Sequence, residues 1–278
     1  MYKKAYGIIE ALAPLHVGAT AGEESGNLNL IFRDQFSKTG IIPGSSIRGR
    51  LRSEMRSDNG EQEANYWYGN EAGSEQSNVN NESIVKFEYA SVVWIPVFCP
   101  GQPIVWVSCP YLLKRYQRIA GDAVKFNDKF LKDIDIPDIY TGSKNLKARE
   151  SQGKKTLFFN LGFLTVKHTK DLSAWFPNGK QQPSVIVDDN DIGMIHDMAL
   201  YRQSRVRLKA DEKIVDGGGF FNTEALPEGT ILVFPIAIKN DNSGKTWQPF
   251  NGDNNTDIYL GGLESIGFGH CNLTLQGV

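Results

Sequence analysis

The chain has few of the features that mark secreted, zinc-binding or membrane proteins. Only three cysteines, Cys99, Cys109 and Cys271, occur in 278 residues. They are too few and too scattered for a disulfide framework or a zinc site. We therefore expect free thiols and a cytoplasmic protein. The sequence shows no signal-peptide pattern and no apolar run long enough to span a bilayer, so we expect no membrane partner.

The chain also has little net charge. It carries 30 Lys and Arg against 32 Asp and Glu, and its formal net charge is −2. Any basic surface for nucleic acid must therefore be local. Apolar residues make up 40% of the chain, which is enough for a sizeable core. We find no convincing linker, so we expect one domain spanning residues 1–278.

The segment 41–52, Ile-Ile-Pro-Gly-Ser-Ser-Ile-Arg-Gly-Arg-Leu-Arg, is typical of a strand end, a turn and a helix start. Pro43 restricts the backbone and Gly44 permits the turn. Either serine that follows is a suitable N-cap. A helix that begins here directs free backbone N–H groups and the positive end of its dipole outward, which favours a phosphate. The predicted anion contacts are Ser45, Ser46, Arg48, Arg50 and Arg52. The alternative is an ordinary capped helix with solvated arginines.

The rest of the chain predicts an α+β fold with a mostly antiparallel sheet. Helices are expected at 110–120 and 192–201, with Lys114, Arg115 and Arg118 on a solvated face. Polar stretches predict insertions near 53–83, 122–152 and 170–229. Tyr66, Trp67 and Tyr68 could stack on bases, but a core anchor is the favoured interpretation. Strands are expected at 6–15, 84–96, 104–108, 156–168, 185–191, 230–239 and 272–275.

Two further segments could contact a polyanion. Residues 202–208 and 219–222 predict the arms of a hairpin that carries Arg202, Arg205 and Arg207; without other information a plain surface hairpin is the simpler interpretation. Residues 261–270 form a glycine-rich loop near the end of the chain. It lacks the third glycine and the following βαβ unit of a dinucleotide fold. Its bare backbone could instead approach a phosphate at Gly261, Gly262, Gly267 and Gly269.

Taken together, these motifs resemble the RAMP superfamily, and in particular the backbone subunit of type III CRISPR-Cas RNA-guided effector complexes. The resemblance implies a ferredoxin-like (RRM-like) core with long insertions, one of which is a thumb-like β-hairpin. It also implies guide RNA, target RNA and other CRISPR-Cas subunits as partners. The matching segments keep their order along almost the whole chain: 41–52, 94–101, 105–115, 204–208, 216–229 and 261–270.

The resemblance also assigns roles to residues. The helix start at 45–52 would hold the guide backbone, with the glycine-rich loop facing it. The hairpin would pass between guide and target and interrupt their pairing at a regular interval. His16 lies in a Leu-His-Val-Gly turn that the family shares, so it is expected to be architectural or close to RNA. A guide-processing ribonuclease that uses His16 is a weaker alternative, because no catalytic partner is evident. An interaction module without RNA contact would leave the basic helix start unexplained.

Cleavage of target RNA is a separate question. The family's cleaving subunits carry an aspartate a few residues before an arginine-acid pair, which Arg33 and Asp34 match. That spacing falls on Leu28, or by a one-residue slip on Asn27 or Asn29, and none of these is an acid. Glu23, Glu24 and Asp34 are the nearest candidates, and their offsets do not match. We therefore expect a non-catalytic subunit without a tightly bound cofactor. The alternative is a metal-dependent endoribonuclease that uses Mg or Mn.

Overall fold

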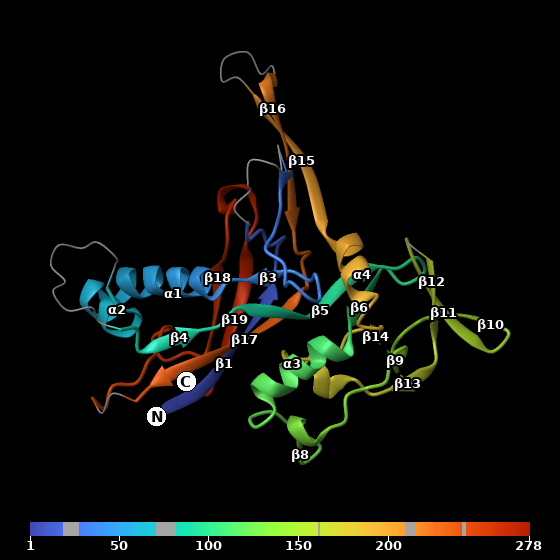
Figure 1. The fold of residues 1–278 in the computed structure, drawn as a ribbon, viewed down its shortest axis with the longest axis horizontal. Helices are drawn as coiled ribbons and strands as arrows, with labels where there is room; N and C mark the ends of the chain where they lie inside the picture. Colours follow the sequence, from blue (N-terminus) through green and yellow to red (C-terminus); the bar gives the residue numbers. More distant parts are fainter. Residues whose placement is uncertain (19–27, 71–81, 161, 209–214, 241–242) are drawn as a thin grey trace.

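A mixed sheet of eleven strands forms the centre of the molecule (Figure 1). This computed structural model describes residues 1–18, 28–70, 82–160, 162–208, 215–240 and 243–278. Two short strands branch from the main order, since β3 (Ile41–Ile42) pairs with β5 and β4 (Val85–Phe87) pairs with β17. The main order is β13 (His168–Lys170), β9 (Thr141–Ser143), β14 (Ser184–Ile186), β6 (Ile104–Ser108), β5 (Ala90–Phe98), β17 (Ile231–Lys239), β1 (Tyr2–Ala11), β19 (His270–Gln276) and β18 (Asn255–Tyr259).

The central strands are buried on both faces, and their side chains alternate between two cores. Strand β1 pairs antiparallel with both β17 and β19. On one face, Ile9 and Leu232 belong to the larger core, whereas on the other face Ile8 and Val233 belong to a smaller one. Because β17 is buried on both faces, its sequence is apolar at nearly every position rather than at alternate positions.

Helices cover both faces of the sheet. Helices α1 (Gly44–Asn59) and α2 (Glu61–Tyr68) pack on the larger core, to which α1 contributes Ile47 and Leu51. Helix α3 (Pro110–Ala120) packs on the smaller core through Leu113 and Tyr116, and it lies across the sheet from α1 (Figure 1). Helix α4 (Ile192–Ala199) joins the larger core near the hairpin. Among the described residues, three short 3₁₀ helices lie in connections: η2 (Leu131–Asp133), η3 (Ser173–Trp175) and η4 (Glu264–Ile266). None of the helices in the described ranges is long and apolar enough to cross a membrane.

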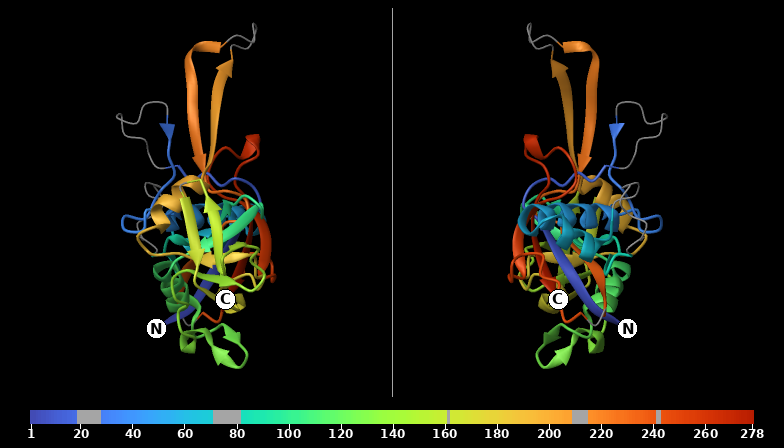
Figure 2. Two further views of the ribbon diagram at one scale, coloured as in Figure 1. Left: turned by 90° about the vertical axis from the view of Figure 1, so that its right-hand side faces the viewer. Right: turned by 90° about the vertical axis from the view of Figure 1, so that its left-hand side faces the viewer.

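Smaller sheets extend from this body. Strand β15 (Tyr201–Leu208) and strand β16 (Val215–Ala225) form a long antiparallel hairpin. It projects from the end of the body opposite the two termini (Figures 1 and 2). Strand β2 (Leu28–Asn29) runs parallel to β16 at the hairpin base. The other small sheets are β10 (Arg149–Ser151) with β11 (Lys154–Phe159) and β12 (Gly162–Val166), and β7 (Lys125–Phe126) with β8 (Lys129–Phe130).

Predictions that rest on local pattern are largely confirmed. Helix α3 has the predicted bounds, with a proline in its first turn where the missing N–H costs nothing. The basic helix after Gly44, strands β6 and β17 and the hairpin arms are present. Trp67 and Tyr68 are buried in the core, as favoured.

Several other predictions are wrong. Strand β1 begins at Tyr2 and ends at Ala11, earlier than expected. The segment after Ser53 is helical to Tyr68, because one face of its polar sequence packs on the sheet; residues 71–81 of this predicted insertion lie outside the described ranges. The stretch 122–152, predicted as an insertion, contributes the fully buried strand β9 to the main sheet. Arg115 is buried rather than solvated, and its Nε donates to Ser91 Oγ at 2.8 Å.

Candidate nucleic-acid interface

A cleft of about 450 Å³ joins the two segments that the sequence marks as anion contacts. The N-terminal half of α1 forms one wall through Ser46, Gly49 and Arg50. The glycine-rich loop forms the other wall through Gly261 and Gly262. These segments are about 200 residues apart in the chain. The remaining lining residues are Val17, Gly18, Ser53, Tyr259 and Glu264.

The start of α1 is shaped by backbone geometry rather than by a side-chain cap. Pro43 is the N-cap residue and no side chain caps the helix, so the prediction that Ser45 or Ser46 is the N-cap is wrong. Both serines lie in the first turn, which contains no acidic residue to offset the dipole. A Cβ on Gly44 would lie 2.4 Å from the Phe87 carbonyl oxygen, so only glycine lets the helix start so close to β4.

The glycine-rich loop is held against the segment that follows β1. The Gly262 N–H donates to the His16 carbonyl at 3.0 Å, and the Gly269 N–H donates to the Pro14 carbonyl at 2.9 Å. Gly261 has φ +83°, and a Cβ there would lie 2.1 Å from the His16 oxygen. Gly262 has no such restriction, because a Cβ there would meet nothing within 4 Å. Gly267 also has positive φ, at +91°.

The three predicted arginines of α1 have different surroundings. Arg50 lines the cleft, and its guanidinium pairs with Glu54 at 2.5 Å and Glu264 at 3.6 Å. Arg48 donates to the Tyr68 carbonyl at the end of α2. Arg52 is buried and donates to Asn65 Oδ1 at 2.7 Å. Arg48 and Arg52 therefore tie α1 to α2, and Arg50 is the arginine of the three that lines the cleft.

The hairpin arginines and His16 meet near the hairpin base. Arg202 pairs with Asp197 at 2.8 Å and Glu224 at 3.1 Å. Arg205 lies over the ring of Phe268, with 4.8 Å from its guanidinium carbon to the ring centroid. His16 is buried, and its Nδ1 donates to the Glu224 carbonyl at 2.6 Å. Arg207 lies in β15, and its side chain is outside the described part.

Of the candidate acids, Asp34 lies within the described part of the chain. Asp34 Oδ1 accepts hydrogen bonds from the Phe36 and Ser37 N–H groups, at 2.9 and 2.8 Å, and so closes its own turn. Leu28 and Asn29 form β2, whereas Glu23, Glu24 and Asn27 lie outside the described residues. Within the described ranges, no group of three His, Cys, Asp or Glu side chains is placed to hold a metal ion.

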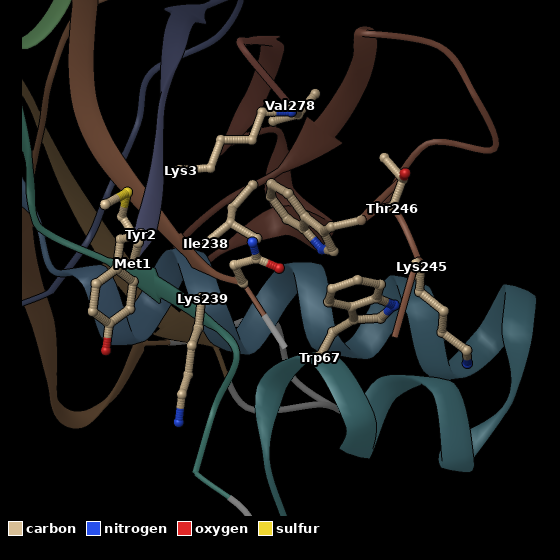
Figure 3. A pocket seen from close by; sticks show the side chains of 12 residues that line it. Met1, Tyr2, Lys3, Trp67, Ile238, Lys239, Lys245, Thr246 and Val278 are labelled. Atoms are coloured by element: carbon tan, nitrogen blue, oxygen red, sulfur yellow. The ribbon is translucent and has the colours of Figure 1, made fainter. Parts of the chain in front are cut away.

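A second cavity, of about 430 Å³, lies where the two chain ends meet α2 (Figure 3). Its lining mixes apolar groups such as Trp67, Ile238 and Val278 with lysines. One of these, Lys245, pairs with Glu63 at 2.9 Å. This cavity shares no lining residue with the α1 cleft.

Sequence reasoning missed the acids that accompany the arginines. Glu264 lines the cleft beside Arg50, and Glu224 is buried between Arg33 and Arg202. The sequence carries no signal for Glu224, because it follows Asn222 and Thr223 in a polar stretch of β16 and is buried only by the tertiary fold. A buried carboxylate needs a charged partner.

Residues 8–272 match the model of the RAMP superfamily, and the chain belongs to that superfamily. Its mixed α/β architecture, with one large mixed sheet, is consistent with that membership.

Individual relatives cover nearly the whole chain. The CRISPR system Cmr endoribonuclease Cmr4 of Pyrococcus furiosus is 24% identical over 99% of this chain and 97% of its own length. A chain in the cryo-EM structure of the type III-B Cmr-beta complex bound to cognate target RNA shares the fold, with a TM-score of 0.71 and 20% identity over 98% of this chain and 96% of its own. The crystal structure of oligomeric Cmr4 from Pyrococcus furiosus is also similar, with a TM-score of 0.65 and 17% identity over 98% of each chain.

Proposed function

We propose that this chain is the guide-RNA (crRNA)-binding backbone subunit of a type III CRISPR-Cas interference complex that acts in antiviral defence. Its partners would be the guide RNA, the target RNA and the other subunits of the complex. The observation that carries the proposal is the cleft in which the basic start of α1 faces the glycine-rich loop. RAMP membership and the Cmr4 relatives support the same role.

The cleft has the chemistry of a backbone site rather than a base-reading site. Its described lining contains four glycines, Gly18, Gly49, Gly261 and Gly262, and two serines, Ser46 and Ser53. These small residues let a phosphate approach the backbone closely. The Nε–H of Arg50 is shielded from solvent and has no acceptor among the described residues. Backbone contacts carry no base information, so guide binding would be independent of sequence.

We assign the β15–β16 hairpin the role of the thumb that passes between guide and target. Its length and its projection from the body support this role. The proposed ferredoxin-like core is supported by the central antiparallel strands and by α1 and α4, which both contribute to the larger core. The polar insertions would then be additions to a single RAMP domain.

We further propose that the chain does not cut the target. The position expected to hold the family's aspartate falls on Leu28, which lies in β2 beside the hairpin. The Asp34 carboxylate accepts a hydrogen bond from the Phe36 N–H within its own turn. A labelled, matched target RNA with Mg or Mn tests this point in the assembled complex. Loss of a cut opposite this subunit in Asp34→Ala or in Glu23→Ala/Glu24→Ala would instead establish the endoribonuclease.

Single variants test the cleft directly. Arg50→Ala should weaken guide RNA binding and lower the slope of log affinity against log salt by about 0.7, the value for one phosphate contact on a single strand. Arg48→Ala should lower the stability of the protein but leave the salt slope of RNA binding unchanged, because the Arg48 guanidinium already donates to the Tyr68 carbonyl. Arg118→Ala, an exposed arginine on α3, is the control. Unchanged affinity and slope in Arg50→Ala would refute the cleft as the guide site.

A further inference from the structure

Four charged side chains form a ring at the base of the hairpin. Arg33 Nη1 contacts Asp197 Oδ1 at 3.0 Å, and Arg33 Nη2 contacts Glu224 Oε2 at 3.0 Å. Arg202 closes the ring, since its Nη2 lies 2.8 Å from Asp197 Oδ1 and 3.1 Å from Glu224 Oε1. The four residues come from the segment after β2, from α4, from β15 and from β16. The ring therefore joins both hairpin arms to the body.

Burial makes this ring more than a surface ion pair. The Glu224 side chain is only 4% exposed and the Arg33 side chain 27% exposed. A buried carboxylate is costly unless charged hydrogen bonds satisfy it, so the folded hairpin base requires both arginines. Each guanidinium bridges two carboxylates with its planar fork. Burial alone would raise the pKa of Asp197, but the hydrogen bonds from Arg202 and Arg33 outweigh it and hold that pKa below its usual value.

Contacts from the glycine-rich loop hold the hairpin base as well. Phe268 packs edge-on against Tyr201, with ring centroids 5.8 Å apart, and lies under Arg205. His16 donates to the Glu224 carbonyl, so the turn after β1 holds β16 at the same residue. The hairpin base is thus restrained from the body by ion pairs, by an aromatic contact and by a backbone hydrogen bond.

Small changes in direction at this base become larger along the arms. Six residues of β15, 203–208, extend beyond the ring, which is about 20 Å of strand. A tilt of about 10° at the base would then move the far end of β15 by about 3.5 Å, which is about one nucleotide step along a strand. The direction of the hairpin therefore determines which nucleotides it meets.

We propose that Arg33 and Glu224 are positioning residues: the ring that they form with Asp197 and Arg202 sets the direction of the hairpin and hence the nucleotide at which it interrupts guide–target pairing. This inference rests on the proposed function. It gives Arg33 and Arg202 a role distinct from phosphate contact, because their guanidinium groups are held by carboxylates of the chain itself.

The test is chemical probing of unpaired target bases, at single-nucleotide resolution, in the assembled complex with guide and target RNA. Wild type should show unpaired bases at sharp, regular positions. Arg33→Lys keeps the charge but replaces two nitrogens, each bonded to a different carboxylate, with a single ammonium nitrogen. Part of the reactivity should therefore move to neighbouring nucleotides while the guide stays protected. Glu224→Gln should have the same effect. Lys132→Gln, which breaks an exposed pair with Asp122, should leave the pattern unchanged.

Asp197→Asn keeps the experiment decisive if Glu224→Gln does not fold. The Asp197 side chain is 49% exposed, so this variant should fold, and it should give a smaller spread of reactivity. Assembled variants of Arg33 and Asp197 with the sharp wild-type pattern would overturn the inference and leave the proposed function intact. A wild-type complex without regularly spaced unpaired bases would instead refute the thumb role itself.

Discussion

Glu264 should weaken RNA binding in the cleft, and replacing it should strengthen that binding. Glu264 lies in η4, lines the cleft and sits 3.6 Å from Arg50. A phosphate bound at Arg50 must therefore compete with a carboxylate that is already there. Glu264→Gln removes the negative charge and keeps nearly the same shape. The variant should fold, because a half-exposed pair of this kind contributes at most about 1 kcal/mol to stability.

The size of the effect follows from Coulomb's law. Two unit charges about 6 Å apart interact by about 1 kcal/mol at the high effective dielectric of an open cleft. This corresponds to an affinity gain of about five-fold. Salt should reduce the gain, because the Debye length falls from about 10 Å at 0.1 M to about 3 Å at 1 M.

Fluorescence anisotropy with labelled single-stranded RNA over a salt series measures this gain. Glu82→Gln is the matched control, since it removes the same charge from an exposed glutamate that pairs with Lys86 and Lys239 away from the cleft. The argument fails if Glu264→Gln binds no more tightly than wild type. It also fails if Glu82→Gln gives the same gain, because net charge rather than position would then be the cause.

Two further predictions concern stability. Gly261→Ala should lower the free energy of unfolding by more than about 2 kcal/mol, because Gly261 has a positive φ and a Cβ there would clash with the His16 carbonyl. Gly262→Ala is the control and should change the free energy of unfolding by less than about 0.5 kcal/mol. Similar denaturation midpoints for the two variants would contradict this. Burial, reinforced by the nearby Arg33, lowers the pKa of His196 from 6.5 to about 3. The unfolded state therefore binds the proton more readily than the folded state. The free energy of unfolding should fall by about 1 kcal/mol when the pH is lowered from 6 to 5. His196→Gln, which can still accept the Gly40 N–H bond, should lose this pH-dependent component, and an unchanged pH profile would disprove the assignment.

Local sequence chemistry accounts for the elements that were predicted well. The proline and the apolar spacing of 110–120 specify α3 without help from distant residues. The apolar run of β17 and the turn at Gly44 are equally local signals. These features depend on a few neighbouring residues, so they can be derived before any contact is known.

Long-range packing accounts for the features that the sequence did not predict. The sequence predicts Arg115 on a polar, solvated helix face. In the structure its guanidinium donates to the Ser91 hydroxyl on β5 and to the carbonyl of Tyr89, the residue before β5. Thr141, Gly142 and Ser143 have no strand pattern, yet β13 and β14 bind them on both sides. Such outcomes depend on partners far along the chain, and no local periodicity encodes them.

The amino-acid sequence by itself determined the RAMP resemblance, the basic helix start, the hairpin and the lack of an acid at Leu28. The tertiary structure decided which of these residues share a surface. It placed Arg50 opposite the glycine-rich loop, and it withdrew Arg48 and Arg52 into the contact with α2. It also surrounded Glu224 with Arg33 and Arg202. The physical reason is that a charged side chain is free for a ligand only if the fold does not use it to satisfy its own buried polar groups.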